Sequence, residues 1–308
     1  MPWPQAELRS RRTLLLVNPT AGGGRARQAK RQVTGYLCSH GAAFHVVESR
    51  SAEHLEELAA VAEAAGYSHL AILGGDGAFH YALNGSFGRS IVLAFFPCGN
   101  GNDIAMGLGI PTDAVAAVHE FLRRRPKRVD VLRTRCSGGR QRIFIGAGGL
   151  GLDAEAARLV HGQFRRWPGV ARYIGAAFWA LARFEPLLLR ATFDDLAWQG
   201  RVLIAAVANS PSYGAGVKIA PTARMDDGWM DITIADDLPW TRIVEAILPL
   251  LRDGDLRWPE IHRFRARRAR FETDRGILMH GDGELLGETP AEIEVLPGAV
   301  QIAGIPGA

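Results

Sequence analysis

The chain has 308 residues, a formal net charge of +4 and 47% hydrophobic residues, which is ordinary for a globular protein large enough for two domains. The charge excess is too small to indicate nucleic-acid binding. Three cysteines, Cys38, Cys98 and Cys136, are too widely spaced for a metal motif, so a reduced compartment is the simplest interpretation. No run of about 18 uncharged apolar residues occurs, so we expect no membrane span and a cytoplasmic protein.

The first part of the chain alternates apolar strands with helical segments. The predicted strands are Thr13 to Val17, Phe44 to Val47, His69 to Leu73 and Ile91 to Phe96. The predicted helices are Arg25 to Leu37, Glu53 to Ala65 and a segment that Thr112 caps and that runs through Arg125. This alternation predicts a parallel sheet covered by helices on both faces.

Three of these strands end in polar or glycine-rich loops, at residues 18–24, 74–77 and 97–103. Glycines allow close approach of a phosphate, and a helix N-terminus favours negative charge. Because ligands of open α/β sheets bind outside the carboxyl ends of strands, we expect the three loops to meet at one site. Asp76 would repel phosphate unless a divalent cation lies between them. The alternative is a plain turn in which Asp76 caps a helix.

The pattern changes after Pro126, where short strands follow one another and helices become few. The candidates are Val129 to Arg133, Arg142 to Ile145, Leu187 to Phe193, Val202 to Ala208, Met230 to Ile234, Phe264 to Phe271, Ile277 to His280 and Ile293 to Leu296. They predict an antiparallel sandwich or barrel. We therefore expect an α/β domain over residues 1–130 and a β-rich domain over residues 131–308. The extreme C-terminus could pack back on the first domain.

One helix of the second half, Val170 to Phe184, has an apolar stripe near Trp167 and Trp179. The stripe consists of Tyr173, Ile174, Ala177, Phe178 and Leu181. Such stripes usually pack into a core, and the functional alternative is a wall or mouth for a lipid tail.

Basic residues cluster in two blocks, at residues 123–128 and 263–270. Runs of this kind are usually solvated surface. If the blocks share a face, they could dock on anionic lipid headgroups at roughly 1 kcal/mol per residue.

Six motifs, and their order along the chain, resemble those of the diacylglycerol kinase catalytic-domain family. They are Asn18-Pro-Thr-Ala-Gly-Gly, Gly74-Gly-Asp-Gly with Asn84-Gly85, Pro97-Cys-Gly-Asn-Gly-Asn-Asp103, Val129-Asp130-Val131, Pro221 to Asp231, and Gly281-Asp-Gly-Glu284. That family includes soluble bacterial lipid kinases, sphingosine kinases and ceramide kinases, and it is distantly related to NAD kinases. The similarity covers nearly the whole chain.

The resemblance implies a fold and two cofactors. An N-terminal α/β NAD-kinase-like nucleotide domain would be followed by a C-terminal antiparallel β-sandwich, with ATP and lipid meeting in the cleft between them. The cofactors would be ATP and Mg²⁺. The expected nucleotide contacts are Asn18, Ser49, Gly75, Gly77, Ala78 and Asn100.

The resemblance also assigns carboxylates. Asp76, Asp103 and Asp130 would surround the catalytic Mg²⁺, largely through water. Asp282 would be the general base, and Glu284 would orient it or touch metal. The alternative for this motif is a plain Asp-Gly hairpin turn.

A second, structural Mg²⁺ is implied for the loop from Arg224 to Trp229. Its ligands would be the Asp227 carboxylate and the carbonyls of Arg224 and Trp229. The alternative is a type I turn at Asp226-Asp227-Gly228.

The chain departs from the family pattern at several positions. Ala78 replaces the signature threonine, His80 and Tyr81 replace the usual Asn and Glu, and Asn100 replaces a threonine. A lost hydrogen bond to a charged phosphate costs roughly 1.5–3 kcal/mol. We therefore expect weaker or rearranged ATP binding, and a catalytically impaired protein is an open alternative.

The leading hypothesis is an ATP-dependent kinase of a membrane lipid, acting at the inner face of the membrane and not on nucleic acid. Diacylglycerol is the default acceptor, with ceramide or a sphingoid base next. The alternatives are a lipid- or nucleotide-binding regulator of the same fold and a kinase of a soluble nucleotide such as NAD. The sequence does not indicate an oligomeric state.

Overall fold

The computed structural model describes residues 12–164, 167, 171–214, 216–254 and 256–306. The chain divides into two compact units, Met1–Val129 with Gly298–Ala308, and Asp130–Pro297. Two strands run through the division, β5 (Lys127–Arg135) and β15 (Ala291–Ala303). The chain therefore enters the second unit along β5 and returns to the first along β15.

The first unit is built on a parallel sheet in the order β2, β1, β3, β4, β15. Its first four strands are β1 (Thr13–Val17), β2 (Phe44–Glu48), β3 (His69–Gly74) and β4 (Val92–Pro97). The last strand is the end of β15, where residues 301–303 pair with residues 92–94 of β4. Every residue of β1 and β3 is buried, which is why both read as uninterrupted apolar runs.

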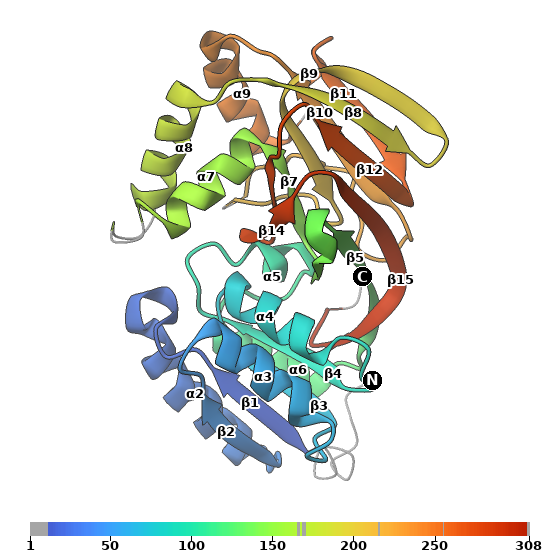
Figure 1. Cartoon of the computed structure of the whole chain (residues 1–308). Helices are drawn as coiled ribbons and strands as arrows, with labels where there is room; N and C mark the ends of the chain where they lie inside the picture. The colour runs from blue at the N-terminus through green and yellow to red at the C-terminus, as the bar shows by residue number, and fades with distance from the viewer. Residues whose placement is uncertain (1–11, 165–166, 168–170, 215, 255, 307–308) are drawn as a thin grey trace. The chain divides into compact units, whose positions relative to one another are not determined.

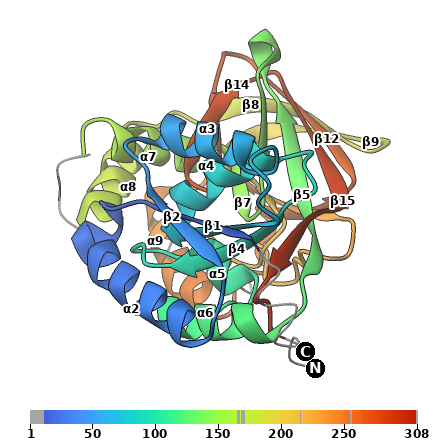
Figure 2. The same ribbon diagram turned by 90° about the horizontal axis from the view of Figure 1, so that it is seen from below.

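Helices cover both faces of this sheet. They are α2 (Arg25–Ser39), α3 (Ala52–Ala62), α4 (Asp76–Ser86), α5 (Asp103–Gly107) and α6 (Ala114–Arg123). Figure 2 shows α3 and α4 together on one face and α2 and α6 together on the other, and the same two pairs pack against each other. The predicted doubly covered α/β architecture is confirmed.

One helix start differs from the prediction. The side chain of Asp113, not of Thr112, caps α6, because its Oδ1 accepts the Ala116 N–H at 2.8 Å. Both residue types are good N-caps. The choice between two adjacent candidates depends on where the chain turns into the helix.

The second unit is a β-sandwich of antiparallel strands (Figure 1). Besides β5 and β15 it contains β6 (Gln141–Phe144), β7 (Ala147–Gly151), β8 (Leu187–Phe193), β9 (Leu196–Ala208), β10 (Met230–Asp236), β11 (Ile261–Ala266), β12 (Arg268–Thr273), β13 (Leu278–Gly281) and β14 (Glu284–Glu288). The main path of pairing is β14, β13, β7, β9, β8, β12, β15, and β10 joins β9 to β11. A large cluster of buried side chains, including Phe144, Leu189 and Phe271, forms the core of the sandwich, and smaller clusters lie around Ala206 and around Ala176.

The predicted strand Phe264 to Phe271 is wrong, because the chain breaks at Arg267 into β11 and β12. Strand β11 pairs with β10, whereas β12 pairs with β8 and β15. The backbone N–H groups of Arg267 and Arg268 donate to the Asp194 carboxylate at the break. The alternating pattern runs through the break and gives no sign of the change of partner.

Strand β7 was missed because its sequence, Ala147-Gly-Gly-Leu-Gly151, has low strand propensity. The glycines are needed for backbone packing. A Cβ on Gly148 would lie 2.1 Å from the His280 carbonyl oxygen, and one on Gly151 would lie 2.4 Å from the Leu203 carbonyl oxygen. Glycine within a strand marks such close approach.

Among its described residues, the second unit also contains the α-helices α7 (Leu152–His161), α8 (Ala171–Arg183) and α9 (Trp240–Arg252), and the sequence predicted α8 but not α7 or α9. Helix α8 packs on α7 through Ala176 and Ala180. Phe178 of the expected stripe is 65% exposed, and the side chains of Tyr173, Ile174 and Ala177 lie outside the described residues. Over the described part of the chain, no helix is both long and apolar enough to cross a bilayer.

Candidate functional site

The three strand-end loops of the first unit meet through backbone atoms. A Cβ on Gly99 would lie 2.7 Å from the Gly75 Cα, and a Cβ on Gly22 would lie 2.2 Å from the Cys98 carbonyl oxygen. A side chain at either position would force the loops apart. Glycine therefore permits the convergence that the strand-end pattern predicts.

Arg25, which the sequence analysis treated only as the start of a helix, ties two of these loops together. Its Nη2 donates to the Gly99 carbonyl at 2.8 Å and to Asn100 Oδ1 at 2.9 Å, and its Nε donates to the Gly22 carbonyl at 3.0 Å. A guanidinium is thus held among glycine loops at the first residue of α2. Its position directly after three glycines is the signal that could have identified it.

Asp76 caps a helix, but not the helix that it begins. Its Oδ2 accepts the Asp103 N–H at 3.2 Å and its Oδ1 accepts the Ile104 N–H at 3.1 Å, so the carboxylate caps α5. This agrees in part with the alternative interpretation of the loop. The cap also connects the second loop to the third.

The carboxylates of Asp76 and Asp103 converge. A Cβ on Gly101 would lie 3.0 Å from Asp103 Oδ2 and 3.3 Å from Asp76 Oδ2, so both oxygens surround one point. Two carboxylate oxygens beside a phosphate cradle suit Mg²⁺, which keeps several of its waters. Among the residues that the structure describes, no three or more His, Cys, Asp or Glu side chains form a metal-binding group. The pair therefore fits a cation shared with phosphate oxygens rather than an all-protein cage.

The side chains of Asn18 and Ser49, the other candidate nucleotide contacts of this unit, form hydrogen bonds to nearby residues of the protein. Asn18 Oδ1 accepts the Thr20 N–H at 3.1 Å and hydroxyl at 2.9 Å. The Ser49 hydroxyl donates to the Val17 carbonyl at 3.3 Å and is buried. Both side chains lie at the carboxyl ends of neighbouring strands β1 and β2 and shape the loops there.

Gly77 and Ala78 lie in the first turn of α4. The Ala78 side chain is buried against Gly74, where an added Cβ would lie only 2.6 Å from the Ala78 Cβ. His80 and Tyr81, which also depart from the family pattern, lie in the same helix, and His80 is 2% exposed. Ala78 and His80 therefore contribute to the packing of α4, and Ala78 leaves the loop without the threonine hydroxyl of the family pattern.

Asp282 occupies the tip of the β13–β14 hairpin in the second unit, with a φ of 54°. Its Oδ2 accepts the Ile145 N–H at 3.0 Å, and its Oδ1 accepts the Gly146 N–H at 2.8 Å. Its own N–H donates to the Ala147 carbonyl at 2.9 Å. The two backbone N–H groups therefore hold the carboxylate in one orientation. Glu284 follows as the first residue of β14.

Asn209 was missed, although it supports both key aspartates of this unit. It is fully buried, and its Nδ2 donates to the Asp130 carbonyl at 2.9 Å and to the Ile145 carbonyl at 2.8 Å. Its backbone N–H donates to the Gly146 carbonyl at 2.8 Å. The segment that orients Asp282 is therefore fixed from its other side by one amide. An asparagine at the end of a long apolar strand is the signal that could have identified it.

Asp130 is 3% exposed, and its Oδ2 accepts the Gly228 N–H at 2.6 Å. It fixes the 224–229 loop. Asp130 belongs to the second unit, whereas Asp76 and Asp103 belong to the first, so the three carboxylates expected around one metal are divided between the units.

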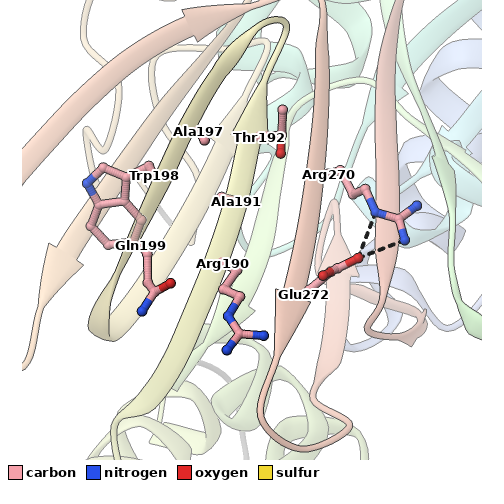
Figure 3. Close-up of a pocket in the computed structure, with 8 residues that line it drawn as sticks. All are labelled: Arg190, Ala191, Thr192, Ala197, Trp198, Gln199, Arg270 and Glu272. Carbon is pink, nitrogen blue, oxygen red and sulfur yellow. Dashed lines mark hydrogen bonds and ion pairs between the residues drawn. The ribbon is translucent and has the colours of Figure 1, made fainter.

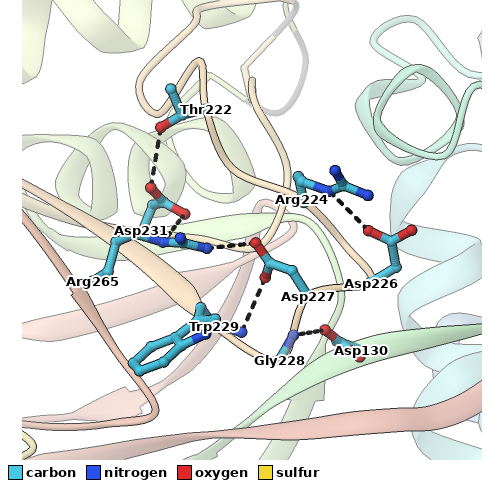
Figure 4. Close-up of polar contacts among 9 residues, drawn as sticks. All are labelled: Asp130, Thr222, Arg224, Asp226, Asp227, Gly228, Trp229, Asp231 and Arg265. Atoms are coloured by element: carbon cyan, nitrogen blue, oxygen red, sulfur yellow. Dashed lines mark hydrogen bonds and ion pairs between the residues drawn. The ribbon is translucent and has the colours of Figure 1, made fainter.

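The 224–229 loop is closed by internal ion pairs (Figure 4). Arg224 pairs with Asp226 at 3.1 Å, and the Arg265 guanidinium pairs with Asp227. Asp227 Oδ1 also accepts the Trp229 N–H at 3.1 Å. Both oxygens of the expected metal ligand therefore already have donors.

His280, two residues before Asp282, belongs to a buried polar cluster with Asp153 and Tyr213. His280 Nε2 is 3.0 Å from Asp153 Oδ2, and the Tyr213 hydroxyl donates to the same oxygen at 3.3 Å. Burial, followed by the Asp153 charge, raises the pKa of Tyr213 well above its usual value. The Tyr213 ring stacks on His280 at 5.9 Å. The cluster ties α7 to the strand that carries the hairpin.

Two arginines of the block at 263–270 form ion pairs with carboxylates. Arg265 pairs with Asp227 and Asp231, and Arg270 pairs with Glu272 and Glu292. The other block, at residues 123–128, belongs to the first unit. Part of the positive charge of the block at 263–270 is therefore offset within the protein.

A pocket of about 390 Å³ lies over strands β8, β9 and β12 (Figure 3). Its lining includes Trp198, Arg190 and the paired Arg270 and Glu272. None of the candidate site residues lines it, and it is not part of the candidate site.

Comparison with known proteins matches both parts of the chain. A diacylglycerol kinase catalytic domain matches residues 12–134, and a YegS C-terminal NAD kinase beta sandwich-like domain matches residues 146–304. The "Diacylglycerol kinase" of Mycobacterium tuberculosis is 30% identical over 93% of each chain. A "Probable lipid kinase YegS-like" of Stenotrophomonas maltophilia is 28% identical over 70% of each chain.

Solved structures show the same fold. A diacylglycerol kinase structure from Bacillus anthracis covers 95% of this chain and 96% of its own, with a TM-score of 0.71 and 20% identity. A second one from that organism reaches a TM-score of 0.79 at 23% identity, over 95% of both chains. The ordered motifs, the two matching domains and the near full-length relatives lead to one conclusion: the chain belongs to the diacylglycerol kinase family and is a lipid kinase.

Proposed function

We propose that the protein transfers the γ-phosphate of ATP to a hydroxyl group of a membrane lipid, with Asp282 as the general base. Diacylglycerol is the first candidate acceptor, because the Mycobacterium tuberculosis relative bears that name. Ceramide or a sphingoid base is the next. The observation that carries the proposal is the seating of Asp282 on two backbone N–H groups.

The first unit supplies the groups that would bind the nucleotide. The glycine loops present backbone N–H groups at the ends of β1, β3 and β4, and Arg25 adds a positive charge among them. Asp76 and Asp103 would hold Mg²⁺, which neutralises charge on the transferring phosphoryl group when bound. Phosphoryl transfer needs mainly this positioning and charge, and little covalent chemistry from the protein.

The second unit supplies the base. Asp282 would accept the proton of the lipid hydroxyl, because two backbone N–H groups orient its carboxylate at the tip of the hairpin. Asn209 would hold that segment in place without touching the substrate.

The test is transfer of labelled phosphate from ATP-Mg²⁺ to a panel of lipids in mixed micelles. Asp282→Asn should lower the rate about 10²- to 10⁴-fold, the usual contribution of a general base. Asp226→Asn is the matched control, since Asp226 is an exposed aspartate paired with Arg224, and it should keep its activity. No labelled lipid, or equal rates for wild type and Asp282→Asn, would contradict the proposal.

We also propose that the enzyme binds the inner membrane surface through α9. Five apolar side chains at helical spacing are exposed there: Trp240 at 68%, Val244 at 47%, Ile247 at 48%, Leu248 at 61% and Leu251 at 50%. This apolar face, together with a lipid acceptor, supports α9 over the paired arginines as the contact.

Sedimentation with anionic vesicles tests this contact. The double variant Leu248→Glu, Leu251→Glu should lose most vesicle binding while phosphorylation of a short-chain soluble lipid is kept. Val61→Glu is the control, because Val61 is 56% exposed on α3 of the other unit. Unchanged vesicle binding of the double variant would exclude α9.

A regulator without catalysis is the second candidate, motivated by Ala78 and the buried His80. Thermal stabilisation by ATP-Mg²⁺ together with labelled lipid would exclude it. Phosphorylation of NAD in the absence of any lipid would instead favour the soluble-nucleotide alternative.

A further inference from the structure

Arg265 contacts the carboxylate that the family resemblance assigns to a structural metal ion. Its Nη2 forms an ion pair with Asp227 Oδ2, and the Trp229 N–H donates to Asp227 Oδ1 at 3.1 Å (Figure 4). Each oxygen of the carboxylate therefore has a donor. A metal ion at Asp227 would meet the positive charge of Arg265 at the same carboxylate.

The sheet fixes the position of this guanidinium. Arg265 on β11 lies directly opposite Asp231 on β10, and its Nε is 3.6 Å from Asp231 Oδ2. The Asp231 side chain is 11% exposed. Burial raises its pKa, and the Arg265 charge acts in the opposite direction by favouring the carboxylate. One guanidinium thus serves two aspartates, as a favourable cross-strand pair does.

The rest of the loop is also closed by protein groups. Asp226 pairs with Arg224, and the Gly228 N–H donates to Asp130. Mg²⁺ demands near-octahedral oxygen ligands at about 2.0–2.1 Å. Of the three implied ligands, Asp227 alone is a charged side chain, and Arg265 already balances its charge. The residues present do not fit the implied metal.

We propose that Arg265 is the built-in cation of the 224–229 loop, so that the loop folds without a divalent metal ion. A planar guanidinium carries a permanent charge and five N–H donors, so one side chain can bind Asp227 and also place its positive charge beside Asp231. Magnesium dependence of the protein then arises from the nucleotide and not from this loop.

Thermal unfolding without nucleotide, in EDTA and in excess MgCl₂, tests the inference independently of catalysis. Wild type should have the same midpoint in both buffers. Arg265→Gln should lower the midpoint by about 2–4 °C, and Arg265→Lys should restore most of that loss because it keeps the charge. Arg267→Gln is the control, since Arg267 lies 4.6 Å from the centroid of the Trp229 ring on the same surface and is expected to change the midpoint by less than about 1 °C.

Two results would overturn the inference. One is a saturable rise of the wild-type midpoint with Mg²⁺ that Asp227→Asn abolishes. The other is an Arg265→Gln protein as stable as wild type. If Arg265→Gln does not fold, the wild-type and Asp227→Asn titrations still decide, because they do not need that variant.

Discussion

The two units build their candidate sites from different materials. In the first, glycines let three loops touch through their backbones, and the candidate groups beside them are one arginine and two carboxylates. In the second, the side chains of Asp130, Asn209 and Asp282 are each held by hydrogen bonds to backbone groups. The first site is therefore sensitive to added volume, and the second to lost polar partners.

The alkylation rates of the cysteines allow the two units to be compared, because each unit contains one buried thiol. Burial raises the pKa of Cys98 in the third loop and of Cys136 in the sandwich to about 11, whereas Cys38 is exposed. At pH 8 a thiol of that pKa is only about 0.1% thiolate, so alkylation of native protein should modify Cys38 at least about 100-fold faster. Mass spectrometry of time points measures the three rates.

Ligand and pH sharpen the same experiment. ATP-Mg²⁺ should slow Cys98 further and leave Cys136 unchanged, and equal protection of both would show that the units respond together. Because folding raises both pKa values from 9.0, the associated stability is complete below pH 9 and is lost as pH rises through about 11.

The variant Asn209→Ala removes hydrogen bonds that support the candidate site of the second unit. The carbonyls of Asp130 and Ile145 lose their amide donor, so the free energy of unfolding should fall by about 1–3 kcal/mol. If Asn209 positions Asp282, kcat should fall about 10-fold or more with little change in the KM for ATP. Denaturant unfolding and steady-state kinetics measure the two effects, and a rise in KM alone would contradict the positioning role.

The variant Gly99→Ala adds a methyl group where two loops of the first unit touch. The new Cβ would meet the Gly75 Cα at 2.7 Å, so the loops must separate at a cost of about 1–3 kcal/mol, and ATP binding should weaken. Gly35→Ala is the control, because that glycine lies inside α2 with nothing within 4 Å of its added Cβ. This control should stabilise the protein by about 0.5–1 kcal/mol. Calorimetric ATP titration that finds equal affinity for both variants would contradict the loop contact.

Asp113→Ala is the smallest expected effect. It removes the α6 cap and should cost about 1 kcal/mol, whereas Thr112→Ala should be close to neutral. Paired urea unfolding curves distinguish the two, and a larger loss at Thr112 would restore the cap predicted from sequence.

The sequence alone determined the α/β followed by β-sandwich order, because strand periodicity and strand-end glycines are local properties that read directly from the chain. The resemblance of ordered motifs to a known family identified Asp76, Asp103 and Asp282 as candidates. Tertiary structure decided which groups pair: Asp76 caps α5, Arg265 reaches Asp227, and Asn209 spans two segments. Those contacts join residues far apart in the chain, and neither propensity nor spacing encodes a partner that only sheet register and loop packing bring within hydrogen-bonding distance.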